Sequence, residues 1–139
     1  MSSGAPVDPV KLLACHDGKP TPEEFHDNLR AVYDELLRVQ AVFHGRILIL
    51  SGYRSRSWNR KIGGAKFSQH MHGRAVDIAP ADPSRLDELR RAVLSLPELD
   101  GASRVKGIGY YPTFVHLDIR PGKQLLRWDG KRLAADAAI

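Results

Sequence analysis

A polar loop gives way to a strand within the segment Ser68-Gln69-His70-Met71-His72-Gly73-Arg74-Ala75-Val76-Asp77. His70 supplies an imidazole, and Asp77 supplies a carboxylate seven positions later. Gly73 lies between them and allows the chain to turn, because glycine adopts backbone angles that other residues avoid. The segment therefore predicts that a loop imidazole and a strand carboxylate come close together.

The strand expected over residues 75–79 has two different faces. Alternate side chains of a strand point in opposite directions, so Val76 and Ile78 share one face and Asp77 lies on the other. The apolar pair must face the core. Asp77 then faces a surface lined by Ala75 and Ala79, whose small side chains leave space for a ligand.

Residues 114–120 repeat this arrangement. Alternation places Val115, Leu117 and Ile119 on an apolar face. The opposite face carries His116, Asp118 and Arg120.

Two histidines and a carboxylate on neighbouring strand faces match the ligand set of a hydrolytic zinc, whose fourth position is open to water. Zinc in such a site lowers the pKa of that water toward ~7. The alternative at this point is that His70 and His116 are hydrogen-bonded structural residues. No HExxH pattern occurs, which excludes a zincin helix.

The remaining sequence predicts an α+β fold, with helices packed on a small, largely antiparallel sheet. One helix is expected to start at Thr21-Pro22, with Thr21 as the N-cap of a capping box, and a second at Asp82-Pro83, ending near Pro97. Strands are expected over residues 46–50, 75–79, 108–111, 114–120 and 125–128, with 46–50 buried and a turn at Pro121-Gly122. No repeat or linker divides the chain, so we expect one compact domain over residues 1–139, with its core at about 21–130.

Composition and charge exclude several classes of protein. A chain of 139 residues with a single Cys can bury a core but can form neither a disulfide framework nor a Cys-rich zinc knuckle. Its apolar runs are too short to span a membrane, and no signal peptide is visible, so we expect no membrane insertion. The net charge of +5 suits an anionic partner. We expect no nucleic-acid binding, because the arginines are dispersed and no aromatic platform or helix-turn-helix pattern is present.

Further motifs occur in a consistent order around these two segments. They are Leu50-Ser51-Gly52-Tyr53-Arg54-Ser55, Asn59, Gly63-Gly64-Ala65, and Gly107-Ile108-Gly109-Tyr110-Tyr111-Pro112 leading into Phe114-Val115-His116-Leu117-Asp118. From about Ile47 to Trp128 the chain resembles the zinc D-Ala-D-Ala carboxypeptidase family, and most of all the small single-domain members found in bacterial cell-wall proteins and phage lysins.

The resemblance implies a D-Ala-D-Ala carboxypeptidase-like (hedgehog/LAS-type) fold that holds one zinc ion per chain through His70, Asp77 and His116. It also implies that Arg54 enters the cleft and binds the scissile carbonyl or a substrate carboxylate, as a guanidinium can. The alternative for Arg54 is an ordinary surface arginine. Ser68 resembles the family's substrate-contacting serine, and its alternative is a hydroxyl that caps the loop.

The chain departs from the family at one position. Many relatives carry a carboxylate as general base three residues before the last zinc-binding histidine, and here that residue is Thr113. Asp118, which shares a strand face with His116, is expected to be either the catalytic base or an outer partner of a zinc ligand, and we favour the base. His72 is a second candidate for proton transfer.

The expected function is a zinc-dependent peptidase that cleaves peptidoglycan stem peptides or cross-links, as a carboxypeptidase or an endopeptidase. We expect a monomer that acts outside the cytoplasm, at the cell wall or in association with a phage. The alternative is a catalytically silent zinc module that binds peptide or cell-wall polymer, which the missing carboxylate at Thr113 suggests.

Overall fold

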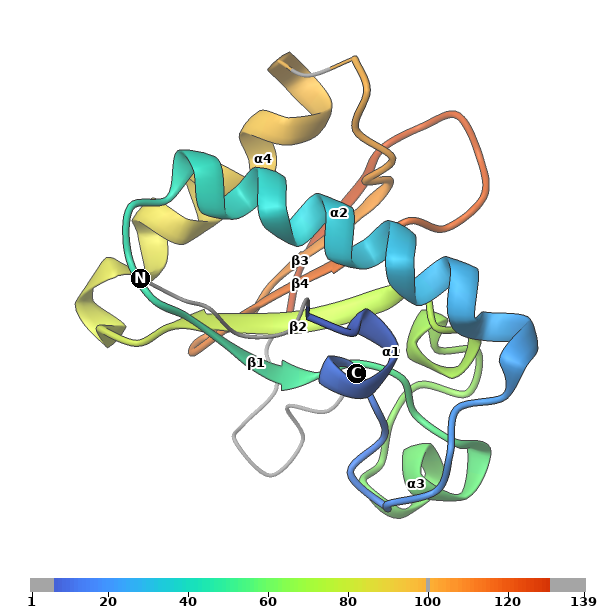
Figure 1. Ribbon diagram of the computed structural model, residues 1–139. Helices are drawn as coiled ribbons and strands as arrows, with labels where there is room; N and C mark the ends of the chain where they lie inside the picture. Colours follow the sequence, from blue (N-terminus) through green and yellow to red (C-terminus); the bar gives the residue numbers. More distant parts are fainter. Residues whose placement is uncertain (1–6, 100, 131–139) are drawn as a thin grey trace.

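The computed structural model describes residues 7–99 and 101–130, and the ends of the predicted 1–139 domain lie outside this range. A five-stranded sheet forms its centre, in the order β1-β2-β4-β3-β5 (Figure 1). The strands are β1 (Ile47–Ser51), β2 (Ala75–Pro80), β3 (Gly107–Tyr110), β4 (Val115–Asp118) and β5 (Leu126–Asp129). The first four pair antiparallel and β5 runs parallel to β3, which confirms the predicted α+β class.

Two long helices, α2 (His26–Val42) and α4 (Leu86–Leu99), cover one face of this sheet (Figure 1). Both are amphipathic, and their apolar stripes pack with the inward side chains of β2 and β4 in one core. Val76 and Ile78 are fully buried in that core, as the alternation predicts. Asp77 therefore faces the side of the sheet that the long helices leave uncovered.

Shorter elements occupy the chain between the strands and near the N-terminus. They are α1 (Pro9–Leu12), η1 (Glu23–Phe25), α3 (Arg56–Lys61), η2 (Gln69–His72) and η3 (Pro83–Arg85), where η denotes a single 3₁₀ turn. Most were not predicted, because turns this short carry no periodic apolar pattern. Two of them, α3 and η2, flank the face on which Asp77 lies. No helix among the described residues is long and apolar enough to cross a membrane.

Both predicted helix starts contain a 3₁₀ turn, but only one is capped as expected. Asp82 accepts a hydrogen bond from the backbone N–H of Ser84 and caps η3, which leads into α4. Thr21 does not cap its helix: its buried hydroxyl has no hydrogen-bond partner among the described residues, and η1 precedes α2. The second helix ends at Leu99, near the predicted end at Pro97.

The structure corrects the prediction that the strand over residues 46–50 is buried. Leu48 and Leu50 are 36% and 41% exposed, because they lie on the face of the edge strand β1 that the long helices leave uncovered. The predicted turn at Pro121-Gly122 lies between β4 and β5, and β5 then pairs with β3 on the side away from β4. The local sequence does not show which strand β5 joins, because strand order depends on contacts between distant segments.

Candidate metal centre

The register of β2 and β4 brings two of the predicted ligands together. Asp77 lies directly opposite His116 in this antiparallel pair. His70 reaches the same place from η2, which ends at Gly73 with a φ of 67°, a left-handed conformation that favours glycine. One ligand atom from each of these three side chains lies within 4.8 Å of the other two. The three side chains are buried, with at most 2% of each residue exposed.

The two imidazoles face the same carboxylate oxygen. Nε2 of His70 lies 3.2 Å, and Nδ1 of His116 lies 3.0 Å, from Oδ1 of Asp77. The other nitrogen of each ring has a hydrogen-bond partner away from Asp77. Nδ1 of His70 lies 2.8 Å from the carbonyl oxygen of Gly52, and Nε2 of His116 lies 2.7 Å from Oδ2 of Asp118. When these outer nitrogens donate, the inner nitrogens present lone pairs toward Asp77, as metal-binding histidines do.

The donor set fits a metal ion. Burial lowers the pKa of His70 and so favours the neutral ring that ligates a metal. Burial alone would raise the pKa of Asp77, but the adjacent rings of His70 and His116 hold it well below its usual range. One carboxylate and two imidazoles are a ligand set that zinc accepts while keeping a fourth position free.

Arg54 lies behind Asp77 and is fully buried, with an exposed fraction of 0%. Its Nη2 donates to Oδ2 of Asp77 at 2.9 Å, while Nε donates to Ser51 at 3.0 Å and Nη1 to Asn59 at 3.3 Å. The surface alternative is therefore wrong. These contacts hold the carboxylate from the side opposite the two imidazoles, which differs from the substrate contact that the resemblance implies.

Asp118 is fully buried and makes contacts on two sides. Oδ2 faces Nε2 of His116, and Arg120 forms a two-pronged ion pair with the same carboxylate, at 2.8 Å from Nε to Oδ1 and 2.7 Å from Nη2 to Oδ2. Burial alone would raise the pKa of Asp118, but Arg120 and His116 hold it well below its usual range. Because the imidazole separates Asp118 from the three ligand atoms, the geometry favours the outer-partner alternative over the predicted base.

A cleft of about 300 Å³ opens beside His116. It is lined by Ala65, Phe67, Ser68, Gln69, His116, Arg120 and Trp128. The Oγ of Ser68 accepts the backbone N–H of His70 at 3.2 Å, which confirms the loop-capping alternative. Ser68 also lines the cleft, and its contact with a substrate stays a prediction. Thr113 is exposed in the turn between β3 and β4. His72 packs edge-on against Phe25 and lines a different pocket, away from the ligand set.

Sequence reasoning missed three residues of this site. Asn59 appeared in a motif without a role, and it links Arg54 to the carbonyl oxygen of Ala65, which it contacts at 2.9 Å. Trp128 lies with its ring centroid 5.3 Å from that of His116, and the Arg120 guanidinium lies over the same indole. Gln69 lines the cleft, and its buried Oε1 accepts no hydrogen bond from any described residue. No local pattern distinguishes these side chains, because their partners are distant in the chain.

A comparison with known protein families gives a match over most of this chain. A model of the family described as Peptidase M15 matches residues 12–118, which include every candidate ligand. No curated protein matches the chain significantly.

Proposed function

The chain belongs to the peptidase M15 family, whose members are zinc peptidases, and from that premise we propose that it hydrolyses peptide bonds in peptidoglycan stem peptides or cross-links. The observation that carries this proposal is the buried set of His70, Asp77 and His116 beside an open cleft. Structural histidines would need no such cleft. Here His116 both faces Asp77 and lines the opening, so a group bound in the cleft lies next to the ligand set.

Zinc held by His70 Nε2, Asp77 Oδ1 and His116 Nδ1 would supply a Lewis acid and a water of lowered pKa. The surrounding residues prepare these ligands. Arg54 holds the second oxygen of Asp77, which leaves Oδ1 directed at the imidazoles. Asp118 fixes the ring of His116 through Nε2, and a carboxylate in this position raises the basicity of the inner nitrogen.

The cleft offers one charged group suited to a peptide. Arg120 lines the cleft, whereas Arg54 is sealed behind Asp77. We therefore assign to Arg120 the stabilisation of negative charge on the substrate carbonyl that the resemblance implied for Arg54.

One observation favours a second candidate function, the catalytically silent zinc module. None of the described residues that line the cleft is a carboxylate, and Thr113 occupies the position where relatives carry a base. A module without a base would bind peptide or wall polymer and leave it intact. In either case we propose a monomer that acts at a cell wall or with a phage, where its net charge of +5 favours an anionic surface.

Digestion of purified peptidoglycan separates the two candidates. The zinc-loaded protein is incubated with the polymer, and mass spectrometry identifies the soluble fragments. A peptidase releases free D-Ala or cleaved cross-links, and the masses distinguish carboxypeptidase from endopeptidase action. The variant His116→Ala, treated in the same way, shows whether the release depends on the metal centre. If the wild-type protein sediments with the polymer but releases no new fragment, it is the catalytically silent module.

A further inference from the structure

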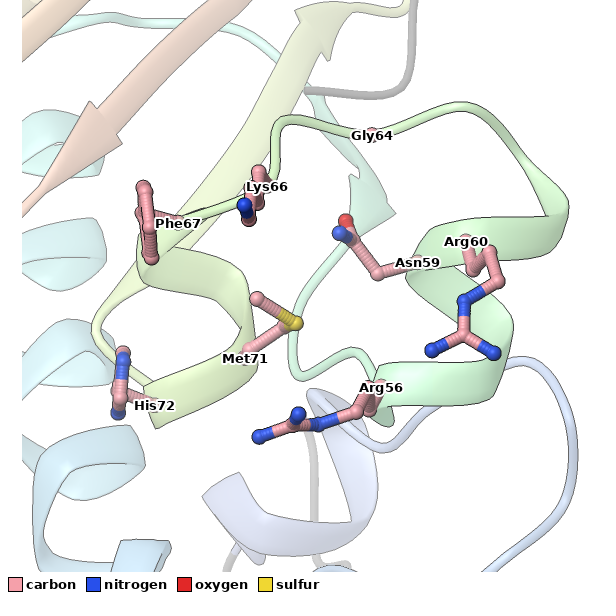
Figure 2. A pocket seen from close by; sticks show the side chains of 8 residues that line it. All are labelled: Arg56, Asn59, Arg60, Gly64, Lys66, Phe67, Met71 and His72. Carbon is pink, nitrogen blue, oxygen red and sulfur yellow. The ribbon is translucent and has the colours of Figure 1, made fainter.

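A second, larger pocket of about 600 Å³ lies next to the metal-centre cleft, and Figure 2 shows its lining. Three of the lining residues are permanent cations: Arg56, Arg60 and Lys66. No carboxylate is among the described residues that line this pocket. All three cations are exposed, and none forms an ion pair with a described carboxylate. Within the described part of the chain, the pocket is therefore a concentration of positive charge with no paired carboxylate.

The fold holds these cations in place. Arg56 and Arg60 are four residues apart on α3, so they lie on the same side of that helix. The helix is anchored at its start, where Ser55 Oγ accepts the N–H of Trp58 and donates to Asp17 at 2.6 Å. Lys66 enters from the loop that follows α3, with its ammonium over the Phe67 ring.

The opposite wall of the pocket is formed by η2. Figure 2 shows the Met71 side chain on this turn pointing toward α3, His72 at the far end of the turn, and the Arg56 side chain extending from the start of α3 toward η2. Ser68 and Gln69, from the beginning of the same segment, line the metal-centre cleft instead. This short segment thus separates the basic pocket from the cleft.

Phe67 connects the two cavities, because it lines both. Its side chain is 80% exposed, which is unusual for a large apolar residue and provides a surface for a peptide to cross. A peptide bound at the metal centre and extended over Phe67 would bring its next residues to Arg56, Arg60 and Lys66. A carboxylate is the group on such a peptide that matches the guanidinium fork.

We propose that this basic pocket is a second substrate subsite, which binds a free carboxylate of the peptide a few residues from the scissile bond. The inference rests on the proposed function, since it names what else on the same substrate the protein recognises. In peptidoglycan stem peptides the D-Glu residue carries such a carboxylate, and its amidated form lacks the charge. The subsite would make the protein selective for the non-amidated peptide.

A matched pair of synthetic stem peptides tests this selectivity. The peptides differ only in whether the free D-Glu carboxylate is present or amidated. Binding to the zinc-loaded protein is measured calorimetrically in the cold, with mass spectrometry confirming that the peptide is intact, and KM and kcat are measured separately. The test variant is Arg56→Gln/Arg60→Gln. The control, Arg46→Gln/Arg91→Gln, removes the same charge from exposed positions outside the pocket.

The wild-type protein and the control are expected to bind the acidic peptide about 10- to 100-fold more tightly than the amide, as charge-assisted hydrogen bonds allow. The test variant should lose this preference through weaker binding of the acid alone, with KM affected and kcat retained. Equal affinity of the wild-type protein for both peptides would overturn the subsite. If the protein binds both peptides equally and also binds purified teichoic acid in a salt-sensitive way, the pocket is a site for a phosphate polymer. That result also overturns the proposed subsite.

The same measurements separate the subsite from the proposed function. Preference for the acid without hydrolysis of either peptide would support the subsite and contradict the peptidase. Hydrolysis of both peptides at equal KM would support the peptidase and contradict the subsite.

Discussion

Gly107 lies directly opposite Asp118 across the antiparallel β3–β4 pair, and a Cβ atom at Gly107 would lie 2.6 Å from the carboxyl carbon of Asp118. The space that a side chain would fill is occupied by the carboxylate that contacts His116 and Arg120. The absence of a side chain at Gly107 therefore leaves room for the Asp118 carboxylate, which holds the ring of His116, a candidate metal ligand, in its orientation.

Gly107→Ala is expected to displace the Asp118 carboxylate and disturb the ring of His116. Overpacking of this kind costs about 1–3 kcal/mol of unfolding free energy, which denaturant titration measures. Zinc affinity should fall in parallel. Gly101→Ala is the control, since a Cβ there meets no atom within 4 Å and both quantities should stay unchanged. Wild-type stability and zinc affinity in Gly107→Ala would show that the carboxylate can move without consequence.

The ligand assignment predicts one zinc ion per chain. Replacing His70 or His116 by Ala removes one of the three converging ligand atoms, so tight binding should be lost. His72→Ala changes a histidine of the same 3₁₀ turn that lines the other pocket, and it should retain the metal. Titration against a chromophoric chelator measures both. Stoichiometric zinc in the double variant His70→Ala/His116→Ala would refute the assignment.

Asp118→Asn distinguishes the two roles that the sequence leaves open. As an outer partner of His116, Asp118 orients the ring, and its loss should weaken zinc affinity ~10- to 100-fold. As a general base, it would leave the metal in place and lower turnover ~100- to 10,000-fold. The contact at 2.7 Å to the outer nitrogen of His116 leads us to expect the first result. Arg120→Gln should lower kcat/KM on peptidoglycan peptides, because it removes the cation that lines the cleft.

Arg54→Lys keeps the positive charge but loses the planar fork that joins Asp77, Ser51 and Asn59. Each buried partner left without a hydrogen bond costs about 1–3 kcal/mol, so denaturant titration should show a large loss of stability. Zinc affinity should fall as well, because Asp77 is no longer held from behind. If Arg54 instead contacted substrate, stability and zinc affinity would be unchanged and only turnover would fall.

Zinc affinity is expected to rise with pH. Burial lowers the pKa of His116, but the carboxylates of Asp118 and Asp77 outweigh burial and raise this pKa above its usual value in the metal-free protein. Binding must release that proton, so affinity should decrease about tenfold for each pH unit below the pKa. Asp118→Asn should shift this dependence to lower pH. Zinc dissociation constants measured across the pH range test the trend, and a constant affinity would contradict it.

The sequence alone predicted the features that depend on the alternation of apolar and polar residues along a strand. The strand pattern of residues 75–79 and 114–120 placed Asp77 and His116 on the face away from Val76 and Ile78, because side-chain direction in a strand follows directly from sequence position. The α+β class followed from the order of the helical and strand-like segments. The family resemblance rested on the same stretches, and the matched residues 12–118 include them.

Tertiary structure alone decided what these residues touch. Arg54 lies in a loop without periodicity, so only the packed chain shows that it is sealed behind Asp77 rather than open to the cleft. Asp118 contacts the outer nitrogen of His116, and this contact depends on the orientation of the ring. It also depends on the space that Gly107, a residue of the neighbouring strand β3, leaves for the carboxylate. Likewise β5 joins β3, and Phe67 joins two cavities, through contacts between segments distant in sequence. Alternation determines the face on which a side chain lies, but its partners depend on how separate elements pack, and no local pattern encodes that packing.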